Sequence, residues 1–447
     1  MVNCNSMVCR IPNALEAYKN MEKLEKKKFD YKWVIVAVCF VMVFTCLGFC
    51  SSNKGRYLGP ITEALGIKRS AFSINDTFRF GVSALVNLFF GALVAKFGVR
   101  KMVGFGFLCL IASVLIYANA EVIYVFFLGG ALLGMGLAFT TTAVASILVK
   151  RWFTGNTGTV LGVVLAANGL GGALAAQIVG PIIDSGVFGY RKAYTLVAII
   201  LAVVGTLAVL LIRDKPKDFQ GELVVKNKKK ARGGGWVGID FQEAKKVGYF
   251  IPACIGIFLT GMVLSGVNGI GSTHMKNDMG LTGSYVDTVM SIHSLVLMGT
   301  KMLAGVIYDK KGLRTMMIMC NGVGVISMVT LALVAPTPMG MLLAMVWGVT
   351  SSIALPMETI GVTLVASDLF GNKCFDQMLG IMLALNHAGY AVGSIVVNGL
   401  YDLCGNTYFY AILMFAAVLA AVTVMYQFII NAAHKKRKQV EEATAAE

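Results

Sequence analysis

The chain has 447 residues, of which 57% are hydrophobic and only 14% are charged, and its formal net charge is +16. A soluble domain carries about 25% charged residues, so this composition excludes an ordinary soluble enzyme. In a soluble protein the positive charge would suggest a nucleic-acid partner, but in so apolar a chain a membrane topology explains it better.

Apolar segments long enough to cross a bilayer recur along the whole chain. A helix needs about 20 mostly apolar residues to span the hydrocarbon core. Twelve segments meet this condition, and they predict an all-α membrane protein with twelve transmembrane helices in two pseudo-symmetric six-helix bundles. The segments begin near Trp33, Phe72, Met102, Glu121, Thr157, Ala193, Tyr249, Tyr285, Thr315, Met339, Asp376 and Asn406.

Polar segments divide the chain into five parts. Residues 1–32 are predicted to be a cytosolic N-terminal segment, and residues 33–212 the first six-helix bundle. Residues 213–247 contain the basic run KNKKKARGGG and are predicted to be a cytosolic linker. Its charge would face anionic lipid headgroups, with a specific protein partner as the alternative. Residues 248–433 would form the second bundle, and residues 434–447 a cytosolic tail.

The distribution of basic residues predicts the orientation. With the N-terminus inside, the cytosolic segments hold thirty of the 39 Lys and Arg residues. Short cytosolic loops are rich in these residues, so both termini are expected in the cytosol of a plasma-membrane protein. The ten cysteines are scattered without metal-like spacing, and no cofactor or metal is expected.

A short basic hairpin occurs twice between apolar segments. The first copy reads GALVAKFGVRK and the second reads GVIYDKKGLRT, at an offset of 214 residues. An offset of about half the chain indicates two tandem bundles with one plan. The repeated positions are Gly91, Lys96, Gly98 and Arg100 in the first copy and Gly305, Lys310, Gly312 and Arg314 in the second.

A second repeat has the pattern LGxxLAxNxxG, in residues 161–171 and again in residues 379–389. It places Asn168 and Asn386 near the centres of corresponding helices. Internal repeats with a binding site at their interface are the general plan of secondary transporters. Either asparagine would therefore hydrogen-bond a substrate, or would bind only the adjacent backbone.

The doubled hairpin resembles the loop signature of the major facilitator superfamily. That signature has an acidic residue four positions after its first glycine. The second copy has Asp309 at this position, whereas the first has Ala95. The resemblance implies that the acid helps to hold the cytosolic gate shut, so the first copy would contribute less to that gate.

A narrower resemblance is to the monocarboxylate transporter and oxalate/formate exchanger branch of this superfamily. It lies in residues 149–172, which read VKRWFTGNTGTVLGVVLAANGLGG, in residues 368–371, which read DLFG, and in residues 399–402, which read GLYD. Members of the branch move small carboxylates. The resemblance therefore implies a small carboxylate as the substrate, with protons as a further partner.

Lys301 is an ionisable residue inside a predicted span, where a charge costs about 2.5–3.5 kcal/mol on insertion scales. It lies one turn before Gly305, where the branch has a substrate-binding arginine. The resemblance thus assigns Lys301 as the cation that binds the carboxylate. The alternative is a lysine that extends toward the hairpin. Proton-coupled relatives also have an aspartate one turn earlier, at the position of Leu297, which weakens proton symport by that pair.

Further polar residues are candidates for the same site. His387 follows Asn386 and would contact the ligand or pack between helices. Lys54 is the nearest match to a helix 1 lysine of the branch, and Arg79 lies about one turn into the second span. These two would attract anions, unless they are exposed loop charges or Arg79 pairs with Asp76. The other intramembrane candidates are His293 and Glu358; the glutamate would bind a proton or cap a broken helix.

These features favour a secondary transporter and not an enzyme. The phosphate-binding pattern GxxxxGK[ST] is absent, which argues against an ATP-driven pump. The predicted substrates are monocarboxylates such as lactate, pyruvate or formate, with no nucleic-acid partner. The alternatives are oxalate/formate exchange, efflux of hydrophobic compounds, for which Lys301 would be dispensable, and a receptor without transport activity.

Overall fold

The structure is a computed structural model, and it describes residues 31–52, 54–66, 69–153, 155–183, 185–215, 236–405 and 407–446. Within these ranges all regular elements are helices, as the composition predicted. Residues 1–30 of the predicted N-terminal segment and residues 216–235 of the predicted linker lie outside the described residues. The side chains of Lys54 and Arg56 lie outside them as well.

The described residues of the first half form ten helical elements. Two of the predicted spans are each divided into two helices, one at Phe89 between α4 and α5 and the other at Thr141 between α7 and α8. The elements are α2 (Tyr31–Leu47), η1 (Gly48–Ser52), α3 (Lys54–Leu65), α4 (Arg69–Leu88), α5 (Phe90–Phe97), α6 (Val99–Asn119), α7 (Ile123–Thr140), α8 (Thr142–Trp152), α9 (Thr157–Ile183) and α10 (Gly189–Leu211).

The described residues of the second half form six longer helices and three short elements, α11, η2 and η3. Here too a span is broken, between α14 and α15, where Pro356 lies in a tight turn. The elements are α11 (Phe241–Ala244), α12 (Phe250–Thr273), η2 (His274–Asp278), α13 (Gly283–Ala332), α14 (Pro338–Ala354), η3 (Leu355–Glu358), α15 (Ile360–Phe370), α16 (Phe375–Leu403) and α17 (Phe409–Ala446).

The predicted number of spans agrees with the described residues. Ten helices are long and apolar enough to cross a membrane, and the pair Ile74–Leu88 and Phe90–Phe97 adds one span that bends by 60°. One of the ten, Thr288–Ala332, contains the non-helical residue Gly312 and is two helices joined at a turn. Dividing it there gives the twelve spans expected from the sequence.

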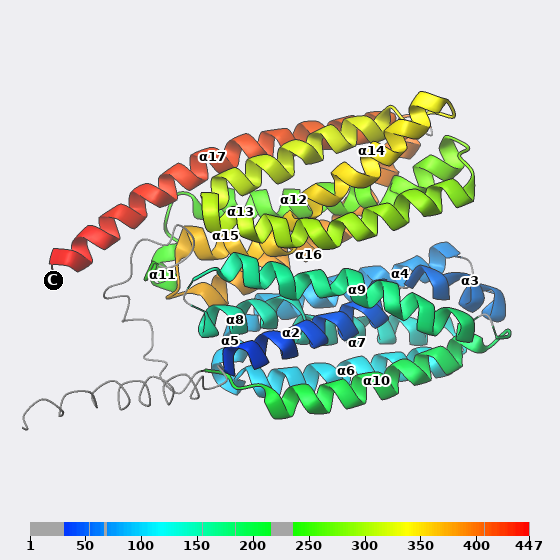
Figure 1. Cartoon of the computed structure of the whole chain (residues 1–447), viewed down its shortest axis with the longest axis horizontal. Coiled ribbons are helices and arrows are strands. Elements are labelled where there is room, and N and C mark those ends of the chain that lie inside the picture. Colours follow the sequence, from blue (N-terminus) through cyan, green and yellow to red (C-terminus); the bar gives the residue numbers. More distant parts are fainter. Residues whose placement is uncertain are drawn as a thin grey trace, which may run out of the picture.

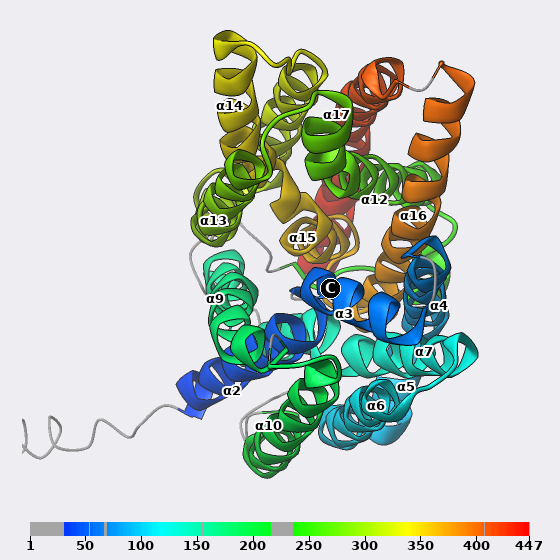
Figure 2. The ribbon, with the colours of Figure 1, turned by 90° about the vertical axis from the view of Figure 1, so that its right-hand side faces the viewer.

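The helices lie in two groups that follow the order of the chain. Figure 1 shows α2 to α10 in the lower group and α12 to α17 in the upper group, with α11 beside their junction. The end-on view of Figure 2 shows the same division, with α9 facing α13 and α4 facing α16. This arrangement confirms the predicted fold class. The exact boundaries of the five parts stay a prediction, and α17 runs without a break into the predicted tail.

The last residues of the predicted linker dock on the second half. The buried Trp236 donates a hydrogen bond from Nε1 to the Asp368 carbonyl oxygen (3.2 Å). The Lys373 ammonium lies 2.9 Å from an Asp240 carboxylate oxygen. Backbone hydrogen bonds between residues 236–239 and residues 370–373 complete this contact. Residues 236–240 therefore extend the second half, although their sequence predicts only a tether.

Glycine residues let the backbone of α9 come into direct contact with the backbone of α2 and η1. A Cβ atom added to Gly171 would lie 2.2 Å from the carbonyl oxygen of Phe44, and one added to Gly48 would lie 2.5 Å from the carbonyl carbon of Gly171. Small residues permit such close contact between membrane helices, because they leave room for one backbone against the other. The first half depends on this contact to hold α9 beside the centre of the protein.

Gly171→Ala should therefore destabilise the first half. The added methyl group forces the two backbones apart, and overpacking of this kind costs about 1–3 kcal/mol. We expect a lower thermal midpoint in detergent, measured by loss of the monodisperse peak in size-exclusion chromatography. Gly269→Ala is the matched control, because a Cβ there has open space around it. Equal midpoints for the two variants would contradict this account of the contact.

Candidate functional site

A cavity of about 360 Å³ lies between the two halves, near the middle of the spans. Residues from both halves line it, and four of the residues predicted for a substrate site are among them: Lys301, Arg79, His387 and Asn168. The polar and charged residues that line the cavity are Ser51, Arg79, Ser83, Asn87, Thr141, Thr142, Asn168, Asn268, Lys301, Glu358, Thr359, His387 and Tyr390.

Lys301 reaches the cavity from α13 and is only 4% exposed. Its ammonium has one long contact, 3.5 Å to the carbonyl oxygen of Leu165 on α9. The two helices are close here because Gly162 faces the lysine backbone; a Cβ at Gly162 would lie 2.7 Å from the Lys301 carbonyl oxygen. A buried ammonium with a single weak partner retains hydrogen-bonding capacity for an anion, since it carries three donors.

Arg79 approaches the cavity from α4. Its guanidinium donates a hydrogen bond to the Ser51 hydroxyl (2.5 Å) and lies 3.9 Å from an Asp76 carboxylate oxygen. It also lies over the Phe80 ring, 5.0 Å from the ring centre. The predicted pairing with Asp76 is present at the limit of an ion pair, and Arg79 lines the cavity as well. It is therefore not an exposed loop charge.

His387 is oriented by polar residues of α4. The Asn87 amide nitrogen lies 3.0 Å from Nδ1 of the histidine, and the Ser83 hydroxyl lies 3.4 Å from the same atom. With the Asn87 amide oriented in this way, Nδ1 accepts the hydrogen bond, and the tautomer that matches this assignment carries its proton on Nε2. The ring also contacts Tyr390 edge to face, with centres 5.3 Å apart. This arrangement leaves one N–H donor on His387 for a ligand.

The two asparagines of the repeat have different surroundings. Asn168 lines the cavity, and its side-chain oxygen accepts a hydrogen bond from Ser52 (2.8 Å). Asn386 is fully buried and is not among the residues that line the cavity. Its amide packs against Gly261 of α12, where an added Cβ would lie 2.8 Å from its nitrogen. The structure thus brings one of the pair to the cavity and not the other.

Some of the residues that line the cavity were not predicted from the sequence. Ser83 and Asn87 were missed, although Arg79, Ser83 and Asn87 recur every four residues and so share one face of α4. A polar stripe in an apolar helix is the signal that could have identified them. Glu358, two positions after Pro356, was predicted to bind a proton or to cap a broken helix, and it lines the cavity. Tyr390 carried no such signal, because a single tyrosine in a span is common.

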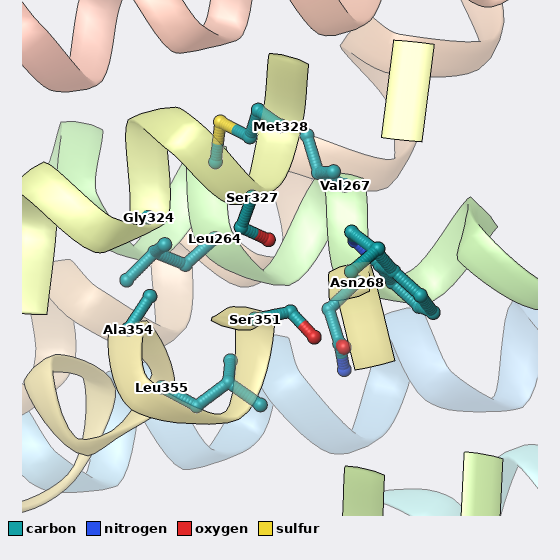
Figure 3. A pocket seen from close by; sticks show the side chains of 10 residues that line it. Leu264, Val267, Asn268, Gly324, Ser327, Met328, Ser351, Ala354 and Leu355 are labelled. Carbon is teal, nitrogen blue, oxygen red and sulfur yellow. The ribbon is translucent and has the colours of Figure 1, made fainter. Parts of the chain in front are cut away.

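A second, smaller pocket of about 10 Å³ adjoins the cavity (Figure 3). Asn268 and Leu355 line both spaces. Figure 3 shows the side chains of Asn268 and Ser351 turned toward each other, and the Asn268 oxygen is buried without a hydrogen-bond partner. A pocket of this size is at the lower limit for one water molecule. It is therefore too small for a substrate.

Asp309 caps the N-terminal end of α9 from the other half of the protein. Its carboxylate accepts hydrogen bonds from the backbone N–H groups of Gly158 (3.0 Å) and Thr159 (2.7 Å), and from the Thr159 hydroxyl (2.7 Å). A negative charge is favourable at a helix N-terminus, where N–H groups point outward. The backbones meet here, because a Cβ at Gly305 would lie 2.1 Å from the Gly158 carbonyl oxygen. This contact closes the cavity on the hairpin side.

The first hairpin makes the corresponding contact without an acid. A Cβ at Gly91 would lie 2.7 Å from Cα of Gln377 at the start of α16, so the backbones again meet. Ala95 occupies the position that corresponds to Asp309. An ion pair between Arg151 of α8 and Asp376 of α16 (2.6 Å) joins the halves at this place instead. The acid missing from the first hairpin is thus present on the helix that the hairpin touches.

Further polar contacts between α8 and the second half extend this closure. The Lys150 ammonium donates a hydrogen bond to the Ser367 hydroxyl (2.5 Å) and lies 3.8 Å from the centre of the Phe375 ring. The hydroxyls of Ser146 and Thr363 are 2.8 Å apart. Because these contacts join the halves, they must break if the hairpin side is to open.

The remaining hairpin residues hold each half together. Gly98 and Gly312 have φ values of +77° and +84°, which a residue with a side chain rarely adopts. Asp214 accepts hydrogen bonds from the backbone N–H groups of Val99 (2.9 Å) and Arg100 (3.0 Å) within the first half.

Two arginines connect the hairpins to neighbouring helices. Arg100 donates to the Val209 carbonyl oxygen (2.6 Å), and Arg314 donates to the side-chain oxygen of Asn431. Each of these contacts lies within one half, so each arginine stabilises its own bundle. The contacts between the two halves come from other residues.

Comparisons with known proteins agree with this architecture. The sequence profile of the Major Facilitator Superfamily matches residues 34–357 and residues 253–446. An uncharacterized MFS-type transporter of Bacillus subtilis (strain 168), YcxA, is 24% identical over 291 residues, which are 64% of this chain and 67% of that protein.

Two solved structures are similar over nearly the whole chain. The proton:xylose symporter XylE bound to 6-bromo-6-deoxy-D-glucose has a TM-score of 0.69 at 14% identity, over 89% of this chain and 96% of its own. The fucose:proton symporter FucP of E. coli has a TM-score of 0.66 at 12% identity, over 90% of this chain and 99% of its own. At such identities the likeness concerns the fold.

Proposed function

We propose that this chain, which belongs to the Major Facilitator Superfamily, moves small organic anions across the membrane by alternating access. The proposed substrates are monocarboxylates such as lactate, pyruvate and formate. The observation that carries the proposal is the Lys301 ammonium, which is 4% exposed and lines a cavity between the two halves.

A buried ammonium needs a partner, because removal of a charge from water costs several kcal/mol (of order 3–5 when one partner of a buried pair is missing). A substrate carboxylate would supply that partner through charge-assisted hydrogen bonds, which are about twice as strong as neutral ones. Lysine provides a point charge without the planar fork of arginine. Other donors must therefore fix the orientation of the substrate.

The proposed orienting donors come from both halves. His387 would donate from Nε2, and Asn168 from its amide nitrogen, since its oxygen already accepts from Ser52. Arg79 would raise the local concentration of anions at the cavity. Lys54 remains a proposed contributor at the start of α3, and Asn386 would support the helix packing near His387.

The hairpins would form the cytosolic gate. The proposed gate residues are Gly91, Gly98, Arg100, Gly305, Asp309, Gly312 and Arg314. Release of the Asp309 cap and of the Arg151–Asp376 ion pair would let the two halves rock apart on the hairpin side. We place this side, and with it both termini, in the cytosol of a cell whose plasma membrane contains the protein.

The volume and the charges of the cavity help to distinguish the proposed carrier from an efflux carrier and from an oxalate/formate exchanger. Its volume, about 360 Å³, lies near the lower end of the roughly 300–1,000 Å³ range of ligand sites. This supports a small solute over the bulky hydrophobic compounds of an efflux carrier. Exchange of oxalate and formate remains the second candidate, because Arg79 and Lys301 are two cations on one cavity.

Counterflow in proteoliposomes tests the proposal. Vesicles that contain the purified protein are loaded with an unlabelled acid, and entry of radiolabelled lactate, pyruvate, formate or oxalate is followed. We expect entry of at least one monocarboxylate above protein-free vesicles. Entry of oxalate alone would favour the exchanger, and entry of none of them, in vesicles that transport a lipophilic cation, would contradict the anion assignment.

A further inference from the structure

Glu358 is the one carboxylate among the described residues that line the cavity. It ends η3, the tight turn where the span formed by α14 and α15 is broken. Tyr390 of α16 donates a hydrogen bond to the Glu358 backbone carbonyl (3.0 Å), which fixes the turn against α16. The break thus places a carboxyl group beside the site that Lys301 and His387 also line.

The carboxyl group of Glu358 is not fully satisfied. Its Oε1 atom is buried and has no hydrogen-bond partner. Among the described residues no ammonium or guanidinium lies within 4.0 Å of it, because no such ion pair is found for Glu358 or for Lys301. A buried carboxylate without a close partner is costly, whereas a neutral carboxylic acid is much less so. The surroundings therefore permit both protonation states of this group.

The charged and titratable groups around Glu358 are few. Lys301 comes from α13, Arg79 from α4, and His387 and Tyr390 from α16. The Arg79 guanidinium is paired with the Asp76 carboxylate. Of the other helices that contact η3, α14 has no titratable residue, α12 has only Cys254 at its far end, and α15 has only Asp368, which faces His434 at 3.4 Å. Lys301 and Glu358 are thus the opposite charges that balance each other across the cavity.

We propose that Glu358 is the proton-binding site that couples anion movement to proton movement. The inference rests on the proposed function, because it requires a carboxylate on Lys301. Two carboxylates beside one ammonium repel each other, so binding of the substrate favours protonation of Glu358. One proton passes from outside water to a carboxylate oxygen of Glu358 as one anion enters, and both leave on the other side.

This exchange conserves charge at each stage. In the empty cavity the Lys301 ammonium and the Glu358 carboxylate sum to zero. In the loaded cavity the ammonium is balanced by the substrate anion, and Glu358 is neutral. No net charge crosses the membrane in either direction, so transport is electroneutral and is driven by the pH difference together with the anion gradient.

Glu358→Gln separates coupling from transport, since glutamine keeps the shape but cannot ionise. Proteoliposomes with an alkaline interior are given radiolabelled lactate, and proton entry is followed with trapped pyranine. We expect the variant to lose pH-driven accumulation and lactate-dependent proton entry by roughly tenfold or more, a change of at least ~1.4 kcal/mol. Lactate counterflow at equal pH should persist, and an imposed potassium diffusion potential should leave wild-type uptake unchanged.

Two further variants make the test decisive. Glu121→Gln removes an exposed carboxylate between α6 and α7 and should behave as wild type. Glu358→Asp keeps a proton site and should retain pH-driven accumulation, even if the glutamine variant does not fold. Full pH-driven accumulation in Glu358→Gln, or loss of counterflow in a monodisperse Glu358→Gln sample, would overturn the assignment while the carboxylate function stands. Wild-type protein that moves no lactate, pyruvate or formate would overturn both.

Discussion

Lys301→Ala is expected to lower carboxylate counterflow by roughly tenfold or more, because a hydrogen bond to a charged group contributes about 1.5–3 kcal/mol. The alanine variant retains the α9–α13 contact, which depends on Gly162 and the lysine backbone and not on the lysine side chain. The measurement is the initial rate of radiolabelled lactate entry into preloaded proteoliposomes. The effect should appear mainly as weaker substrate binding, since the ammonium holds the anion.

The matched control for this variant is Lys435→Ala, which removes an exposed ammonium from α17. It should leave counterflow unchanged. Lys301→Arg should keep part of the activity, because it preserves the charge but changes the donor geometry. If Lys301→Ala transports lactate at the wild-type rate, the Lys301 ammonium does not bind the substrate.

Asp309→Asn should open the hairpin side of the protein. The variant keeps the side-chain shape but loses the negative charge at the N-terminus of α9, where such charges contribute about 0.3–1 kcal/mol and up to ~2 kcal/mol when partly buried. A loss of ~1–2 kcal/mol raises the open fraction roughly 5–30-fold. We expect faster backbone hydrogen exchange in a peptide that contains Gly158 and Thr159, measured by mass spectrometry in detergent.

Asp214→Asn provides the control for that experiment. Asp214 caps α6 with the same kind of backbone hydrogen bonds, to Val99 and Arg100, but both partners lie in the first half. Its removal should accelerate exchange near Val99 and leave the start of α9 unchanged. Equal exchange at Gly158 in wild type and Asp309→Asn would show that the cap does not hold the two halves together.

The sequence was most informative where a feature can be recognised from one residue or one short segment alone. Lys301 stood out because a charge inside an apolar span is costly wherever the helix lies. The twelve spans followed from the length of the apolar runs, and the hairpins followed from a short pattern of glycine and basic residues between two such runs. These features are local, so a single sequence suffices to identify them.

The surroundings of Asn386 could not be predicted in this way. Its repeat partner Asn168 lines the cavity, but Asn386 is buried against Gly261 of a helix far away in the chain. The missing acid at Ala95 gave no hint that Asp376 supplies a carboxylate from the opposite side. Such outcomes depend on which helices meet, and sequence spacing within one element does not contain that information.

A structure determined with a bound monocarboxylate tests the central claim most directly. The carboxylate that gives the strongest counterflow is the one to use. The account predicts an anion in the cavity whose carboxylate oxygen lies at about 2.7–2.9 Å from the Lys301 nitrogen, the length of a charge-assisted hydrogen bond. An anion bound elsewhere in the cavity, with the Lys301 nitrogen still directed only at the Leu165 carbonyl, would contradict it.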